Sequence, residues 1–170
     1  MRLVAEFVEE GSYGGGYRIN GVNLPLAEWP VGSYWTVDGT PNSSSLYHGG
    51  IECAGFARYV YNTIWGSDTY GNAVTARNLN GNSSDFTGIN IGARINCDRR
   101  ASRDPENDDF NNSVGNHSMV LIEKTNTGVT VYEANHSDDP DKYCIVGMRT
   151  ITFNNFYLEY MNIKGTSYTP

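Results

Sequence analysis

The chain has 170 residues, enough for one domain with a hydrophobic core of its own. It carries 12 Lys and Arg against 19 Asp and Glu, a net charge of −7, and no basic run, so binding to nucleic acid or to an anionic membrane surface is disfavoured. No segment is apolar over the length that a bilayer requires, so we expect no membrane insertion. We treat 1–170 as a single domain, either whole or cut from a longer chain, and expect a monomer.

The N-terminal half leads into one short helix. Residues 23–35 (NLPLAEWPVGSYW) indicate an irregular segment packed by its aromatic side chains, and the Gly-, Ser- and Asn-rich residues 36–50 indicate a loop. Residues 51–66 (IECAGFARYVYNTIWG) follow, with Phe56, Val60 and Ile64 at four-residue spacing. This pattern predicts an amphipathic helix that ends at a glycine cap.

The helix begins with a cysteine, Cys53. A thiol in the first helical turn faces unpaired backbone N–H groups and the positive end of the helix dipole, and both favour the thiolate. Cys53 is therefore a candidate nucleophile, and the alternative is a small buried hydrophobic residue.

The C-terminal half predicts an antiparallel meander. Apolar and alternating runs indicate strands at 86–96, 117–124, 129–135, 144–153 and 157–163. The polar residues 98–115 indicate a long surface loop. The fold class is accordingly α+β, with the cysteine-bearing helix packed on a C-terminal antiparallel sheet.

The hairpin predicted at residues 117–135 contains a candidate base for the Cys53 thiol. A three- or five-residue loop between its strands would pair odd with odd positions and place His117 on the same face as Glu133 and Asn135. A four-residue loop would break this arrangement. Thiol catalysis needs such a base and a polar group that orients it, so the predicted catalytic set is Cys53, His117, Glu133 and Asn135.

These residues carry a family resemblance. A cysteine that opens an apolar helix as CAGFA, a strand that begins NHSMV, and a partner strand that ends YEAN resemble the CHAP family, the cysteine, histidine-dependent amidohydrolases/peptidases. The upstream PVGSYW is also similar to segments of some bacterial members. The resemblance covers roughly residues 30–135.

The resemblance implies a papain-like fold of the NlpC/P60 group. It assigns Cys53 as nucleophile, His117 as base, Glu133 as the residue that orients the histidine, and Asn135 as a further polar residue of the site. It implies a bacterial or phage peptidoglycan hydrolase that cuts the N-acetylmuramoyl–L-alanine bond or a peptide bond of the stem or cross-bridge. The expected location is extracellular or at the cell wall, although the first residues lack the apolar core of a signal peptide.

Two positions depart from the family pattern. Ala93 stands where members often have Asp, and Glu52 stands where a small or amide residue is more usual. A carboxylate beside the Cys53 thiolate would work against its ionisation. These departures keep open two alternatives: an inactive binding module on the same fold, and a cysteine hydrolase that acts on another amide.

We expect no cofactor. The acidic segments 104–109 (DPENDD) and 138–141 (DDPD) are weak candidates for calcium, which some CHAP domains bind, because neither has the spacing of a helix–loop–helix calcium site. If Cys53 is the nucleophile, Cys97 and Cys144 remain either as a disulfide or as two thiols. Trp29, Tyr34, Trp35 and Tyr47 either pack in the core or stack on sugar rings.

Overall fold

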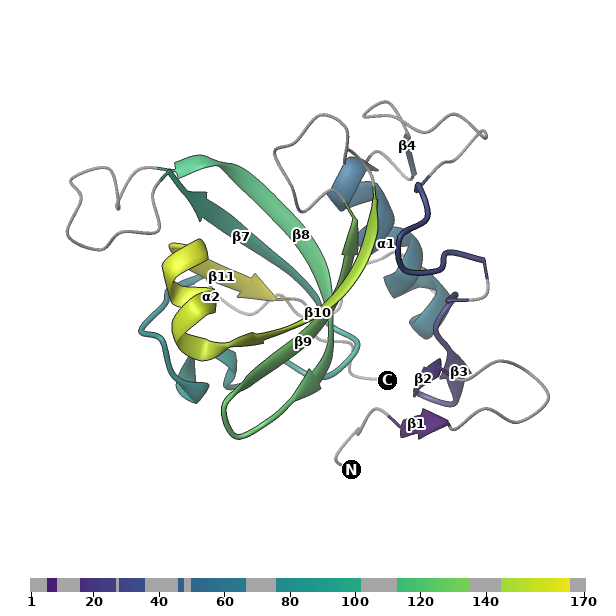
Figure 1. Cartoon of the computed structure of the whole chain (residues 1–170), viewed down its shortest axis with the longest axis horizontal. Coiled ribbons are helices and arrows are strands. Elements are labelled where there is room, and N and C mark those ends of the chain that lie inside the picture. The colour runs from purple at the N-terminus through teal and green to yellow at the C-terminus, as the bar shows by residue number, and fades with distance from the viewer. Residues whose placement is uncertain are drawn as a thin grey trace.

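The computed structural model of the chain describes residues 6–8, 16–26, 28–35, 46–47, 50–66, 76–101, 113–134 and 145–165. Within these ranges the fold is α+β, with a six-stranded antiparallel sheet, two smaller sheets and two α-helices (Figure 1). The α+β class expected from the sequence is confirmed.

The six-stranded sheet is the centre of the fold. In spatial order its strands are β10 (Val146–Thr152), β9 (Gly128–Ala134), β8 (Ser113–Lys124), β7 (Arg94–Arg100), β11 (Asn162–Gly165) and β6 (Arg77–Asn78). Strands β7 to β10 are neighbours in sequence order, so they form the predicted meander. Strand β11 then returns to the free side of β7.

Two small antiparallel sheets come from the N-terminal part. One contains β1 (Glu6–Val8), β2 (Gly16–Ile19) and β3 (Val22–Asn23). The other pairs β4 (Leu46–Tyr47) with β5 (Gly50–Ile51). Strand β5 runs directly into the first helix, so this pairing fixes where the helix begins.

The predicted helix is α1 (Glu52–Trp65), which packs mainly on β8 and β9. Its four-residue apolar stripe, Phe56, Val60 and Ile64, is fully buried. The helix ends at Gly66, whose φ of 68° is left-handed and whose N–H donates to the Asn62 carbonyl at 2.7 Å. The glycine cap expected from the sequence is present.

Aromatic rings attach the segment before the helix to α1 and to the sheet. The Trp35 ring is buried, with its centroid 4.9 Å from that of Trp29 and 5.3 Å from that of Phe56. Phe56 in turn contacts Tyr132 of β9, whose hydroxyl donates to the Trp29 carbonyl at 2.6 Å. Trp35 is therefore a core residue, whereas Tyr34 is 46% exposed.

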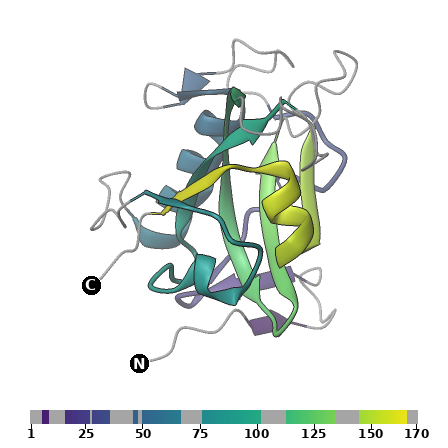
Figure 2. The ribbon, with the colours of Figure 1, turned by 90° about the vertical axis from the view of Figure 1, so that its left-hand side faces the viewer.

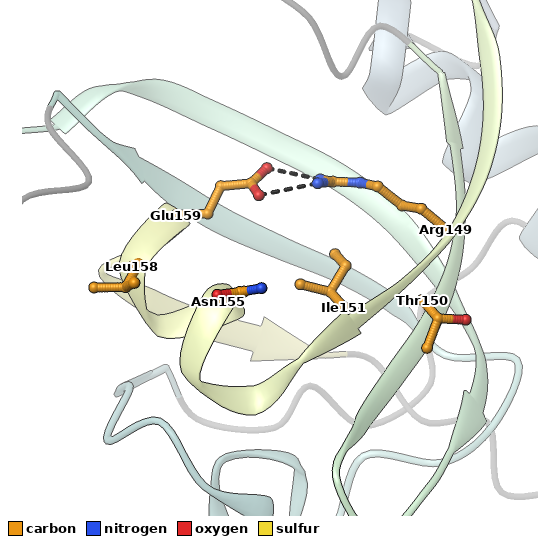
Figure 3. A pocket seen from close by; sticks show the side chains of 6 residues that line it. All are labelled: Arg149, Thr150, Ile151, Asn155, Leu158 and Glu159. Atoms are coloured by element: carbon orange, nitrogen blue, oxygen red, sulfur yellow. Dashed lines mark hydrogen bonds and ion pairs between the residues drawn. The ribbon is translucent and has the colours of Figure 1, made fainter.

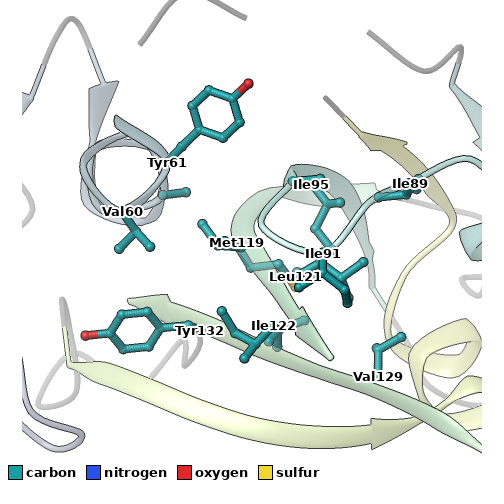
Figure 4. Packing of buried hydrophobic residues seen from close by; sticks show 14 of the residues in the cluster. Val60, Tyr61, Ile89, Ile91, Ile95, Met119, Leu121, Ile122, Val129 and Tyr132 are labelled. Atoms are coloured by element: carbon teal, nitrogen blue, oxygen red, sulfur yellow. The ribbon is translucent and has the colours of Figure 1, made fainter. Parts of the chain in front are cut away.

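In the described part of the chain, a hydrophobic cluster joins the helix to the strands. Figure 4 shows Val60 of α1 on the side of the helix that faces the sheet, where Met119 of β8 and Tyr132 of β9 lie. This cluster holds the start of α1 in a fixed place relative to the strands that carry His117 and Glu133.

The second helix, α2 (Phe153–Glu159), corrects one prediction, because residues 157–163 were expected to form a strand. Thr152 caps the helix by accepting a hydrogen bond from the Asn155 N–H at 3.2 Å. Phe153 and Phe156 are buried, and both of their rings contact that of Phe86. The cap and this helical spacing outweigh the strand-like composition, and only 162–165 enter the sheet as β11. Helices α1 and α2 lie on opposite sides of the sheet (Figure 2).

The strand predicted at 86–96 is also wrong at its start. A 3-10 helix, η1 (Ser83–Phe86), and turns occupy the chain until β7 begins at Arg94. Gly92 turns the chain with a φ of 81°. The loop expected at 98–115 is shortened at both ends by β7 and β8, and residues 102–112 lie outside the described residues.

The turn between β8 and β9 differs from both loop lengths that were predicted to align His117 with Glu133. Lys124 pairs with Val129, which leaves residues 125–128 between them, and this even spacing breaks the odd-to-odd pairing. A β-bulge at Ile122 then inserts one residue into β8, since Leu121 pairs with Val131 and Glu123 with Thr130. The bulge restores the odd-to-odd register, so the shared face is correct although the predicted loop is wrong.

Candidate active site

Three elements bring the central candidate residues together. Cys53 is the second residue of α1, His117 is in β8 and Glu133 is near the end of β9. All three side chains are buried, and Cys53 is the most accessible at 8%. The site is therefore a helix N-terminus facing polar side chains of the sheet.

The hydrogen bond between His117 and Glu133 is direct. The two atoms His117 Nε2 and Glu133 Oε2 are 2.7 Å apart, and neither side chain is more than 1% exposed. A bond made by Nε2 leaves Nδ1 as the ring nitrogen available to a second partner. The juxtaposition expected from the hairpin is thus observed.

Cys53 is a hydrogen-bonding partner of the same imidazole. Burial alone would lower the pKa of His117, but the hydrogen bonds to Cys53 and Glu133 and their negative charges raise it to about 9. The imidazolium is therefore the stable form of His117 at neutral pH.

Glu133 is held as a carboxylate. Burial would raise its pKa, but His117 and Arg149 of β10 lower it to about 2. The Arg149 Nε donates to Oε1 of Glu133, the oxygen that His117 leaves free. Each oxygen of this buried carboxylate consequently has a cationic donor.

The arginine extends the site to α2. Its two terminal nitrogens donate to the Glu159 carboxylate at 2.9 and 2.7 Å (Figure 3). One of these nitrogens also donates to the Tyr160 hydroxyl at 3.0 Å. The Tyr160 ring lies parallel to the His117 ring, with an interplanar angle of 4° and centroids 6.3 Å apart. The histidine is thus covered by Tyr160, the residue that follows α2, as well as by the sheet.

Cys97 of β7 lies directly across from His117 in the strand register. Its thiol is fully buried and forms no disulfide. Burial, followed by the negative charges of Asp98, Glu159 and Glu133, raises the pKa of Cys97 well above its usual value. Such a thiol is unreactive, in contrast to one hydrogen-bonded to an imidazolium.

Several predicted residues lie outside the described residues. These are Asn135, Cys144, the acidic segments 104–109 and 138–141, and the side chain of Glu52. The predicted fourth polar residue and the calcium candidates therefore stay predictions. Of the two alternatives for Cys97 and Cys144, the disulfide is not observed, because Cys97 is a free thiol. Among the residues that the structure describes, no group of three or more His, Cys, Asp or Glu side chains could hold a metal ion. Ala93, the other departure from the family pattern, is a buried residue.

Arg149, Glu159 and Tyr160 were not found from the sequence. Glu159 and Tyr160 fall in the stretch wrongly predicted to be a strand. Arg149 does carry a signal, because it is the single charge in the strand VGMRTIT. An arginine at an inner-facing position of a strand requires a buried acidic partner.

The arrangement supplies the parts needed for nucleophilic acyl transfer. A thiol is hydrogen-bonded to an imidazole, and a buried carboxylate fixes the other side of that imidazole. The thiol sits in the first turn of α1, where backbone N–H groups without helical partners are able to stabilise an oxyanion.

Comparison with known proteins identifies no relative. No family model matches the chain, and neither a curated protein nor a solved structure matches it.

The structure also contains no helix in its described part that is long and apolar enough to cross a membrane.

Proposed function

We propose that this protein is a cysteine hydrolase that cleaves an amide bond of peptidoglycan, with Cys53 as nucleophile, His117 as general acid and base, and Glu133 as the group that orients His117. The observation that carries the proposal is the placement of His117 between Cys53 and Glu133. Three residues distant in sequence meet in the order that thiol catalysis requires.

The reaction follows from this order. The Cys53 thiolate attacks the carbonyl carbon of the amide, and the oxyanion is stabilised by the backbone N–H of Cys53 at the start of α1. The His117 imidazolium gives its proton to the leaving nitrogen as the C–N bond breaks, which releases an amine and leaves a thioester on Cys53. His117 then takes a proton from water, the water oxygen attacks the thioester, and the acid product leaves as the thiolate is restored.

The choice of substrate rests on the resemblance to CHAP domains. The CAGFA, NHSMV and YEAN segments contain the three residues that meet in the structure. This resemblance supports a papain-like arrangement of α1 and the sheet, with Asn135 as a fourth polar residue. It also supports action at the cell wall, outside the cell, on the N-acetylmuramoyl–L-alanine bond or on a peptide bond of the stem or cross-bridge.

A second candidate is a binding module on the same fold without catalysis. The observation that favours it is the low accessibility of the site, since Cys53 is 8% and His117 only 1% exposed. A nucleophile must reach its carbonyl, so this module would bind wall fragments or protein without cutting them.

Digestion of purified peptidoglycan separates the two candidates. The wild-type protein is expected to release fragments whose masses identify the cut bond, and Cys53→Ala is expected to release none while keeping the far-UV circular dichroism of the wild type. Cys97→Ala is the matched control, because it removes a buried thiol that is not part of the reaction. Equal release by Cys53→Ala and the wild type would refute the proposal.

The identity of the amide is tested with the same readout. A panel of purified muropeptides and a protein isopeptide substrate would be incubated with the wild-type protein, and the products would be weighed by mass spectrometry. Cleavage of the isopeptide alone would keep the mechanism and overturn the peptidoglycan assignment.

A further inference from the structure

Beyond the three proposed catalytic residues, the site contains a partly buried arginine, Arg149, whose side chain is 26% exposed and touches none of the reacting atoms. We propose that Arg149 is a positioning residue that holds the Glu133 carboxylate against His117 and is itself held by Glu159. The inference rests on the proposed function of Cys53 and His117 as a catalytic pair.

Glu133 is held at both of its carboxylate oxygens. Its Oε2 accepts from His117 at 2.7 Å, and its Oε1 accepts from Arg149 Nε. Because the two donors occupy both oxygens, the carboxylate cannot rotate without breaking one of these bonds. Arg149 therefore restricts Glu133 to the orientation in which it meets His117.

Arg149 is itself held in place by Glu159 and Tyr160. The bidentate pair with Glu159 and the contact with Tyr160 use the two terminal nitrogens of the guanidinium, whereas Glu133 bonds to Nε. Figure 3 shows this pair bridging β10 and α2, beside a cavity of about 270 Å³. A guanidinium fixed on both sides has one position relative to Glu133.

The charges of the site form an alternating row. Five groups from five elements alternate in sign: Cys53, His117, Glu133, Arg149 and Glu159. Among the described residues, Tyr160, after α2, and Cys97 of β7 also face this set, and both hold their protons because the pKa of each is well above its usual value. Each charge in the row is thus balanced mainly by its neighbours in the row.

The alternation predicts that removing the charge of Glu159 and removing the charge of Arg149 shift the titration of His117 in opposite directions. Without the charge of Glu159, Arg149 attracts Glu133 more strongly and weakens its hold on the His117 proton. Without Arg149, Glu133 is no longer held at both oxygens, but its full negative charge acts on His117 and no nearby cation repels the imidazolium. The loss of the positive charge outweighs the loss of orientation, so the imidazolium becomes more stable. The His117 proton should then be lost at lower pH in Glu159→Gln and at higher pH in Arg149→Gln.

NMR titration of the histidine side chains tests this directly, with the His117 signal assigned by its loss in His117→Gln. We expect the His117 midpoint to fall by roughly 0.5–1 pH unit in Glu159→Gln and to rise in Arg149→Gln. The matched control is Arg100→Gln. Arg100 Nε also bonds to this region, donating to the carbonyls of Tyr157 at 2.8 Å and Tyr160 at 3.1 Å, but it has no bond to Glu133.

If Arg149 served only to anchor α2, its removal and that of Arg100 would both lower stability and leave the His117 midpoint in place. An unchanged midpoint in Glu159→Gln would therefore overturn the proposal, and this variant decides alone if Arg149→Gln does not fold. The titration needs no turnover. A shifted midpoint in a protein that cuts no peptidoglycan would uphold the positioning role and refute the proposed function.

Discussion

His117 and Glu133 are bonded across neighbouring strands although they are not paired in the register. Glu133 pairs with Met119, so its carboxylate reaches diagonally along β8 to meet His117 Nε2 at 2.7 Å. A slip of one residue between the strands would turn one of the two side chains to the other face of the sheet. The site therefore depends on the bulge at Ile122, which sets this register.

Replacement of Glu133 by Gln should impair both activity and stability. The amide still accepts a hydrogen bond from His117, but it no longer stabilises the imidazolium, so we expect the rate of peptidoglycan cleavage to fall by about 100-fold or more. Arg149 loses one of its two buried anions, which should cost about 3 kcal/mol of unfolding free energy in urea titration. The matched control is Glu123→Gln at the exposed end of β8, where we expect changes within about 0.5 kcal/mol and full activity. Full activity in Glu133→Gln would show that this carboxylate has no part in the reaction.

The stability of the protein should depend on pH through the same pair. The pKa of His117 is raised from 6.5 to about 9, so its contribution is fully present below pH 6.5 and is lost as the pH rises through 9. This contribution is on the order of 3 kcal/mol. The pKa of Glu133 is lowered from 4.5 to about 2, so its contribution is present above pH 4.5 and is lost as the pH falls toward 2.

Urea unfolding at pH 5.5 and 9.5 measures the alkaline part of this dependence. The unfolding free energy of the wild type should fall between the two values, and the fall should be smaller in His117→Gln because this variant has no imidazole to titrate. An equal fall in both proteins would contradict a raised pKa for His117.

Cys97 should behave as a structural thiol. Because it is fully buried and its pKa is raised, we expect iodoacetamide to alkylate it roughly 100-fold or more slowly than Cys53 in the folded protein. Peptide mapping by mass spectrometry distinguishes the two sites. Cys97→Ala should lower the unfolding free energy by about 1 kcal/mol and keep the activity. Rapid labelling of Cys97 under native conditions would show that this part of the sheet opens readily.

Gly92 should be intolerant of a side chain. Its φ is 81°, and a Cβ there would lie 2.9 Å from the Trp65 ring of α1 and 3.0 Å from Ile19. We expect Gly92→Ala to cost about 2–4 kcal/mol, from backbone strain and from overpacking. Gly88 is the matched control, with a φ of 77° and nothing within 4 Å of its Cβ, so Gly88→Ala should cost only about 1 kcal/mol. The melting temperatures of the two variants measure this difference. Equal losses in Gly92→Ala and Gly88→Ala would show that backbone strain alone, without overpacking, acts at Gly92.

Local patterns were sufficient to predict α1 and the meander. The apolar stripe of the helix, its glycine cap and the strands β8, β9 and β10 all follow from spacing within a few residues. The register of the hairpin between β8 and β9 does not follow from such local patterns. Met119–Ile122 is a continuous apolar run buried on both faces, so the bulge at Ile122 left no mark in the hydrophobic pattern.

The outer part of the site depends on long-range contacts. Arg149 meets Glu133 because β10 lies beside β9, and it meets Glu159 because Phe153 and Phe156 draw α2 onto the sheet. The residues around Tyr157 have a strand-like composition, so this helix was not predicted from the sequence. The pairing of Glu159 with Arg149 was therefore not expected. Tertiary packing, which the local sequence does not encode, decides these contacts.

The pH profile of Cys53 alkylation tests the central claim, that His117 and Cys53 form a reactive pair, most directly. The second-order rate constant with iodoacetamide would be measured from pH 5 to pH 9 in the wild type and in His117→Gln, with Cys53 identified by peptide mapping. We predict that the wild type keeps rapid alkylation near pH 6, because the imidazolium stabilises the thiolate, and that His117→Gln reacts only above about pH 8, as an ordinary thiol does. Superimposable profiles in the two proteins would contradict the account.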